Sequence, residues 1–148
     1  MAKHRTGEPW MPADEYGRWL PTFSVNLLVR DMPKSVAFYR DVLLAIVEYS
    51  DADFAALKLH GQRMMLHTDH TYENHPWSKA LAGAGPRGVG AEMRLFGLDP
   101  DQVETRARTH GAPVLLPPTD KPHGWREVWV GDPDGYLWTV GVALAKKP

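Results

Sequence analysis

Imidazole and carboxylate side chains crowd one short stretch of this chain. His67, His70 and His75 occur together with Asp69 and Glu73. These two groups are the usual protein ligands of zinc and iron. The spacing of the three histidines, however, matches no known metal-binding motif on a regular helix or strand. We therefore interpret the stretch as a solvated loop that could close over a pocket, and keep a metal site as the alternative.

A second candidate is the carboxylate of Glu92, which lies in an apolar stretch that predicts a strand. A buried and unpaired carboxylate is costly, so Glu92 must face a wet pocket or pair with a cation such as Arg94 or Arg126. In a pocket it could bind a ligand amine or act as a general base with a raised pKa. Glu92 is thus the candidate catalytic residue, and the structural ion pair remains an equal alternative.

Other side chains in the predicted strands could contact a ligand. Arg126 could clamp a carboxylate, and the tryptophan rings near the end of the chain could stack on a planar molecule. Packing in the core or in a dimer interface, and local hydrogen bonding, are the alternatives for these residues. The predicted ligand pocket comprises Asn26, Met65, His67, Glu92, Arg126, Trp129, Trp138 and Thr139.

Hydrophobic periodicity predicts the elements that would position these residues. An apolar strand at 23–29 is followed by a helix that Asp31 caps, with Pro33 in its first turn. Three short strands follow at 45–49, 54–59 and 63–68. The order is therefore βαβββ.

The same order recurs after a Gly- and Pro-rich connection at 69–90, which includes a short helical turn at 77–82. A strand at 91–96 precedes a helix that begins at Asp99 and ends near His110, where Gly111 suits the left-handed position. Strands at 114–116, 127–130 and 136–142 complete the second half, with the turn DPDG between the last two.

The two halves repeat at roughly 68 residues, the interval from Asp31 to Asp99. A half of this size cannot enclose a core alone, so we expect the halves to pack together. The alternative is a generic α+β sandwich whose halves agree by chance.

Composition excludes several classes of function. With 17 Lys and Arg against 18 Asp and Glu, the net charge of -1 provides no field for nucleic acid or an anionic membrane. No cysteine is present, which excludes a disulfide framework, a thiolate metal site and a cysteine nucleophile. No run of about 18 apolar residues could span a bilayer, and the polar, Pro-rich leader lacks a signal-peptide core. We expect a cytoplasmic protein with neither nucleic-acid nor membrane partners.

Two longer motifs carry a family resemblance. VNLLVRDMPKSVAFYRDVL resembles the opening of vicinal oxygen chelate proteins (the glyoxalase, bleomycin-resistance and dioxygenase group), and VWVGDPDGYLWTVG resembles their closing hairpin. The resemblance implies an α+β fold in which two βαβββ modules form a cupped, eight-stranded mixed sheet, and it implies a homodimer. On this basis we expect an N-terminal extension at 1–21, a single domain at 22–143 with modules 22–68 and 91–143 around the connection 69–90, and a tail at 144–148.

The resemblance also implies where a metal would bind, because many relatives hold a divalent ion with four side chains. The corresponding positions here are Ser24, Glu92, Thr139 and a position near Met65, with His67 two residues later. Only Glu92 is clearly a competent ligand, with His67 as the fallback second ligand. We therefore expect no cofactor, and keep a divalent metal as the alternative.

These observations favour a protein that binds an amphipathic small molecule in a pocket without the usual metal site. The alternative is a metal-dependent or acid–base lyase, isomerase or dioxygenase that uses Glu92. Whether the chain is an enzyme stays open at this point. A further departure from relatives is Leu44, since they often end the first helix with glycine.

Overall fold

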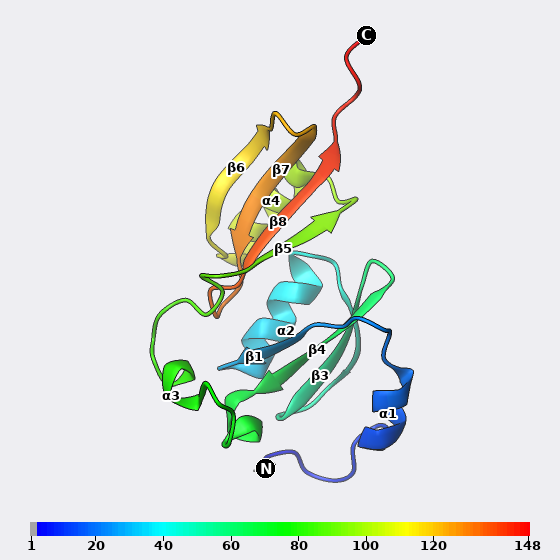
Figure 1. Ribbon diagram of the computed structural model, residues 1–148, viewed down its shortest axis with the longest axis vertical. Helices are drawn as coiled ribbons and strands as arrows, with labels where there is room; N and C mark the ends of the chain where they lie inside the picture. The colour runs from blue at the N-terminus through cyan, green and yellow to red at the C-terminus, as the bar shows by residue number, and fades with distance from the viewer. Residues whose placement is uncertain (1–2) are drawn as a thin grey trace. The chain divides into compact units, whose positions relative to one another are not determined.

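A computed structural model describes residues 3–148 of the chain and divides them into two compact units (Figure 1). The first unit runs up to Arg40 and continues over Leu44–Gly83, and the second comprises Asp41–Leu43 and Ala84–Pro148. Each unit contains one four-stranded mixed sheet. The two sheets confirm the predicted α+β class and the duplication of the βαβββ order.

The first unit adds short helices to its βαβββ core. Its elements are α1 (Ala13–Trp19), β1 (Asn26–Val29), α2 (Met32–Asp41), β2 (Ile46–Ser50), β3 (Phe54–Leu59), β4 (Gln62–Thr68), the 3-10 helix η1 (Asp69–Tyr72) and α3 (Ser78–Leu81). The strand order is β1-β4-β3-β2; β1 and β4 are parallel and the other pairs antiparallel. Parallel pairing requires a crossover, and the chain between β1 and β4 passes through α2.

Alternation along the strands separates two faces of the first sheet. Leu27, Val29 and Leu66 are buried on one face together with the apolar side of α2, which includes Tyr39. The other face carries the partly exposed side chains of alternate residues on β4, namely Arg63, Met65 and His67. This second face is where the predicted pocket residues of the first unit lie.

The second unit repeats this topology with regular helix ends. Its elements are β5 (Glu92–Phe96), α4 (Pro100–His110), β6 (Val114–Asp120), β7 (Trp125–Gly131) and β8 (Leu137–Ala143), in the order β5-β8-β7-β6. The Asp99 carboxylate accepts a hydrogen bond from the backbone N–H of Asp101 at 2.9 Å, and Gly111 ends the helix with a φ of 80°. Both capping predictions are confirmed.

The structure differs from the sequence-based elements mainly at sheet edges and in the leader. Strand β6 extends to Asp120 through Pro117 and Pro118, which an edge strand tolerates because one side of it needs no ladder hydrogen bonds. Helix α1 and η1 were not predicted, since such short helices owe their stability to packing rather than to propensity. The single domain and the closing of the sheets into one cup stay predictions.

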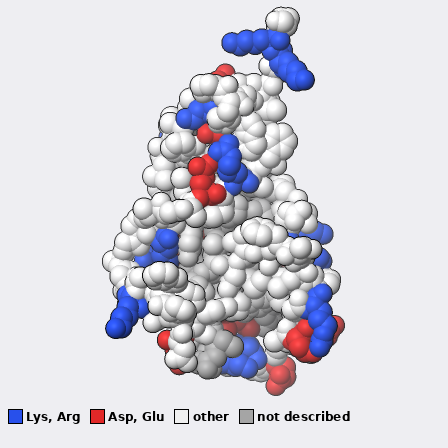
Figure 2. Space-filling view, viewed as in Figure 1, with Lys and Arg blue, Asp and Glu red and all other residues white. Residues whose placement is uncertain are grey.

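No helix in residues 3–148 has the length and apolar character needed to cross a membrane. The charges visible in Figure 2 are interspersed, with basic and acidic side chains side by side and no large area of one sign on that face. This distribution agrees with the nearly neutral net charge of the sequence.

Leu44 occupies the left-handed region of backbone conformation, with a φ of 58°. Its side chain is 48% exposed, so little packing offsets the strain. For an L-residue this conformation costs about 1–2 kcal/mol relative to the right-handed region, whereas glycine adopts it freely. Leucine in place of glycine at position 44 therefore leaves a strained backbone conformation shortly after α2.

We expect Leu44→Gly to raise the free energy of unfolding by about 0.5–1 kcal/mol, because relief of the strain exceeds the entropy that glycine adds to the unfolded chain. Urea denaturation of both proteins measures this difference. Gly111→Ala is the matched control: its left-handed φ of 80° predicts a loss of about 1 kcal/mol, although a Cβ there meets no atom within 4 Å. An unchanged or lower stability of Leu44→Gly would contradict the assignment of strain.

Candidate functional site

An N-terminal segment, defined here as residues 3–20, packs on the face of the first sheet that bears His67. The Tyr16 ring meets the edge of Phe54 with ring centroids 5.1 Å apart, and Trp10 meets Tyr49 at 5.2 Å. The guanidinium of Arg63 lies 3.4 Å from the centroid of the Trp19 ring. Aromatic contacts and a cation–π contact thus hold α1 and its approach against the sheet.

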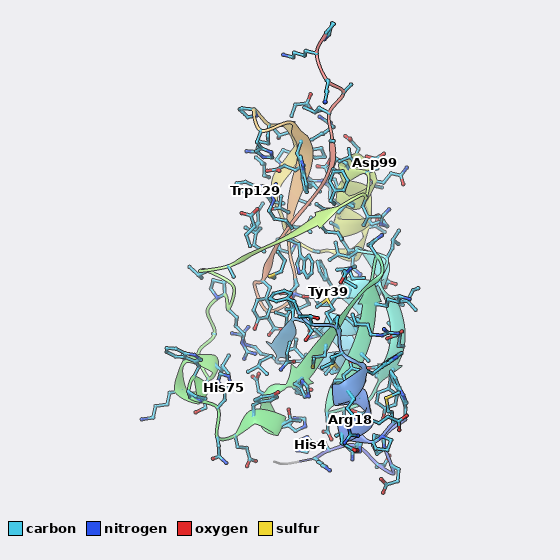
Figure 3. The ribbon with its side chains drawn as sticks, turned by 45° about the vertical axis from the view of Figure 1, so that its right-hand side comes forward. His4, Arg18, Tyr39, His75, Asp99 and Trp129 are labelled. Atoms are coloured by element: carbon cyan, nitrogen blue, oxygen red, sulfur yellow. The ribbon has the colours of Figure 1, made fainter. Side chains whose placement is uncertain are left out.

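Asp53 anchors the beginning of this segment. Its buried carboxylate accepts hydrogen bonds from the backbone N–H groups of His4 at 2.7 Å and Arg5 at 3.3 Å, and it lies 2.7 Å from Nε2 of His70. The rings of His4 and His70 stack with centroids 3.6 Å apart, and Figure 3 shows His4 at the N-terminal end of the first unit. Burial alone would raise the pKa of Asp53, but these hydrogen bonds outweigh it and the pKa is lowered.

A cavity of about 510 Å³ lies between the N-terminal segment and the sheet. This volume is within the usual range for small-molecule sites. Its walls are largely aromatic and aliphatic, with β4 contributing Met65 and His67. The aromatic lining consists of Trp10, Tyr16, Tyr49 and Phe54.

Charged groups also line the cavity, and most of them are already engaged. Asp51 accepts a hydrogen bond from the Tyr49 hydroxyl at 2.7 Å and two more from backbone N–H groups, and Arg5 lies beside Asp53. Lys3 and Glu8 are exposed, and within residues 3–148 neither forms an ion pair or a side-chain hydrogen bond. An ammonium group and a carboxylate therefore remain available to a polar end of a ligand.

His67 is the titratable residue that β4 contributes to the cavity. Its Nδ1 lies 2.7 Å from Oδ1 of Asn26, and Nδ2 of Asn26 donates to the Tyr72 hydroxyl at 3.0 Å. Burial lowers the pKa of the imidazole, against a weaker opposing effect of Asp51. The ring is therefore neutral at neutral pH. The structure thus brings Asn26 into contact with His67, and Met65 and His67 line the cavity.

In the second unit, Glu92 belongs to a chain of charges. Arg94 donates hydrogen bonds to Glu92 and, at 3.0 Å, to the buried carboxylate of Glu127. Glu127 also accepts from Nε1 of Trp129 at 3.0 Å and lies 3.2 Å from Nε2 of His123. Burial would raise the pKa of Glu127, but these partners lower it. The ion pair with Arg94, one of the two alternatives for Glu92, is present.

The predicted pocket residues of the second unit lie on two faces of its sheet. The register pairs Arg94 with Thr139 and Thr139 with Trp129, so these side chains share one face. Trp138 and Arg126 belong to the opposite face. Figure 3 shows Trp129 among the strands of this unit. Trp129 and Trp138 therefore cannot stack on the same ligand within one unit.

Arg126 already holds a carboxylate. Its Nε and one terminal nitrogen each donate to Asp101 of α4 at 2.8 Å, and the other terminal nitrogen donates to Asp120 at 3.0 Å. The bidentate geometry that the sequence suggested for a ligand is thus used to tie α4 to β7. Thr139, in contrast, is fully buried and its hydroxyl bonds to no described residue.

The crowded histidines do not converge on one point. His67 bonds to Asn26, His70 faces Asp53, and Nδ1 of His75 accepts a hydrogen bond from the backbone N–H of Trp77 at 3.0 Å. Figure 3 places His75 in the connection beside α3. Each imidazole has a separate partner, so the three rings do not form one site. The loop expected from the sequence is in part regular structure, because His67 belongs to β4 and His70 to η1.

The donor set does not fit the divalent metal that relatives use. Across residues 3–148, no group of three or more His, Cys, Asp or Glu side chains has the proximity needed to hold a metal ion. The guanidinium of Arg94 neutralises Glu92, the one competent ligand among the family positions. Ser24, Met65 and Thr139 offer neutral or soft donors that hold hard cations poorly.

Sequence reasoning missed the contribution of the N-terminal segment to the site. Two signals were available: Trp10, Tyr16 and Trp19 occur within ten residues of a polar leader, and the turn before β3 carries both Asp51 and Asp53. Neither signal identifies its partner, because the contacts join residues distant in the sequence, such as His4 and Asp53, which are 49 positions apart.

The family profile described as Glyoxalase/Bleomycin resistance protein/Dioxygenase superfamily matches residues 23–140. The chain belongs to this superfamily. The match spans both βαβββ modules and leaves the whole N-terminal segment outside it. A search of curated proteins finds no match to the chain.

Solved structures from the superfamily share its fold. A family enzyme from Burkholderia phytofirmans PsJN has a TM-score of 0.68 at 18% identity, over 82% of this chain and 97% of that one. A glyoxalase/bleomycin resistance protein/dioxygenase from Nocardioides has a TM-score of 0.65 at 24% identity, covering 91% and 95%. Fosfomycin resistance protein FosX from Mesorhizobium loti has a TM-score of 0.60 at 12% identity, covering 83% and 92%. At these identities the similarity concerns the fold alone.

We expect Asp53→Asn to loosen the N-terminal segment. Because the folded pKa of Asp53 is lowered, its charge stabilises the fold above the ordinary Asp pKa of about 3.9, and this stabilisation is lost as the pH falls through that value towards the lowered one. The variant should therefore lose stability at neutral pH and show a shallower loss on acidification. Hydrogen exchange at the amides of His4 and Arg5 should accelerate, whereas unchanged exchange would contradict the anchoring role.

Proposed function

We propose that this superfamily member binds an amphipathic small molecule in the cavity between its N-terminal segment and first sheet, without a metal ion. The observation that carries the proposal is the cavity itself. It has a volume of about 510 Å³, its walls are rich in aromatic rings, and it is bordered by Lys3 and Glu8, which have no side-chain partner among the described residues. Such a site binds an apolar body through its walls and orients it through a few polar groups.

The lining supports an amphipathic ligand over a fully apolar or a highly charged one. Trp10, Tyr49 and Phe54 supply apolar surface, whereas Lys3 and Glu8 supply one charge of each sign. Neutral His67 adds a polar group without adding a charge. A ligand with a flat apolar body and one polar end satisfies all three features.

Binding should appear as ligand-dependent thermal stabilisation. A molecule that binds only the folded chain, present at a hundred times its Kd, adds about 2.7 kcal/mol to the free energy of unfolding, which raises the Tm by several degrees. We expect amphipathic aromatic compounds to produce this shift in a chemically broad panel. Absence of any shift across the panel would sink the proposal.

A matched pair of glycine variants locates the site. Gly17 of α1 lines the cavity and a Cβ there meets no atom within 4 Å, so Gly17→Phe fills the cavity without a clash at the backbone. Gly90 has equal space around it but lies outside the cavity, which makes Gly90→Phe the control. We expect the thermal shift to disappear in Gly17→Phe and to persist in Gly90→Phe.

Metal independence has its own test, which is elemental analysis of protein purified without an affinity tag. We expect iron, zinc, manganese and nickel to stay well below one equivalent, because Arg94 already neutralises Glu92. Glu92→Ala and His67→Ala should not change the metal content. Stoichiometric metal that is lost in these variants would overturn the proposal and favour a metal-dependent enzyme.

An acid–base enzyme is the second candidate function. The neutral imidazole of His67 in the cavity favours it, since such a group accepts a proton near neutral pH. Glu92 has less support as the base, because its carboxylate is already paired with Arg94. Turnover that Glu92→Gln abolishes would nevertheless restore Glu92 to that role.

We also propose, from the family resemblance, that the protein forms a homodimer in the cytoplasm. Large apolar side chains are exposed in each unit, including Phe23 and Ile46 in the first and Phe96 and Leu115 in the second. Such side chains are common in subunit interfaces. Sedimentation analysis at micromolar concentration tests the association.

A further inference from the structure

A chain of hydrogen bonds on the first sheet determines which nitrogen of His67 carries the proton. In the structure Nδ2 of Asn26 donates to the Tyr72 hydroxyl, and the amide oxygen faces the imidazole, 2.7 Å from Nδ1. An amide oxygen only accepts hydrogen bonds, and Nδ1 must therefore be the protonated nitrogen. In the neutral ring, Nε2 is then left with a lone pair and no proton.

The ring is also held in orientation. Phe54 packs against it with centroids 5.0 Å apart, and Tyr72 meets it edge-on at 5.1 Å. His67 lines the cavity, and its Nε2 bonds to no residue that the structure describes. A fixed hydrogen-bond acceptor is thus available where the sheet forms the wall of the cavity.

The donors of the sheet side of the cavity are already engaged. Met65 and Phe54 are apolar, the Tyr49 hydroxyl donates to Asp51, and the Thr71 hydroxyl donates to the carbonyl of Thr68. The remaining donors, which include Lys3, Arg5 and the unpaired hydroxyl of Tyr16, belong to the N-terminal segment. A ligand that lies against the sheet therefore meets an unsatisfied acceptor, and it must bring its own donor to pair with it.

We propose that His67 selects the ligand: the cavity takes planar apolar molecules that carry an N–H or O–H donor, which bonds to Nε2 of His67. This inference rests on the proposed binding function and adds the chemical class of the ligand. Asn26 and Tyr72 are positioning residues, because they act through the tautomer and orientation of His67. A ligand of the same shape that lacks the donor leaves Nε2 desolvated and unpaired.

Indole and 1-methylindole test the proposal, because they share a planar apolar body and only indole carries a donor. We expect the wild-type protein to bind indole about five-fold more tightly in ligand-observed NMR titrations, the usual effect of one neutral hydrogen bond. His67→Phe should bind both molecules with nearly equal affinity. A preference for indole that persists in His67→Phe would show that the added methyl group is excluded by shape, and would overturn the proposal.

The nitrogen resonances of His67 test the cause separately. In the wild-type protein, ¹⁵N spectra should show a protonated Nδ1 and an unprotonated Nε2. Asn26→Leu removes the acceptor for Nδ1–H, and it should mix the two tautomers and weaken the preference for indole while the protein remains folded. A protonated Nε2 in the wild-type protein would overturn the proposal whatever the affinities are.

The outcomes also separate this inference from the proposed function. Equal binding of the two indoles by the wild-type protein overturns the role of His67 and leaves the cavity as a binding site. The same conclusion follows if the panel of amphipathic compounds binds and neither indole does. If neither the panel nor the indoles bind, both proposals fail.

Discussion

Each four-stranded sheet packs one face against a helix, so the apolar surface and the polar groups of its other face must find other partners. This constraint governs both halves of the protein. In the first unit the other face carries aromatic side chains on which the N-terminal segment packs. The buried carboxylate of Asp53 makes this packing specific, because it accepts hydrogen bonds from the backbone of His4 and Arg5. The cavity exists because the segment covers the face without filling it.

In the second unit the corresponding face carries charged side chains, and these form ion pairs with one another. Glu127 is buried, and a lone buried carboxylate would cost several kcal/mol. Arg94, Trp129 and His123 all approach it, and Arg94 extends the chain to Glu92. The same cation that stabilises Glu127 thus neutralises the carboxylate at the family's metal position. One guanidinium therefore pairs with both carboxylates.

The two units therefore use equivalent parts of a duplicated fold differently. At the interval of the repeat, Asn26 of β1 corresponds to Arg94 of β5. Asn26 holds a neutral imidazole in one tautomer, whereas Arg94 binds two carboxylates. The equivalent positions thus carry a neutral hydrogen bond in the first unit and an ion pair in the second.

The sequence by itself determined the strands and the long helix of each βαβββ module and their order, since hydrophobic periodicity, the Asp99 cap and Gly111 act over a few residues. It also placed Met65 and His67 on one face of the same strand. Only the tertiary structure decided that residues 3–20 line the cavity, that Arg126 binds Asp101, and that Trp129 and Trp138 face opposite ways. These outcomes depend on strand register and on contacts between distant residues, for which a local pattern of side chains carries no information.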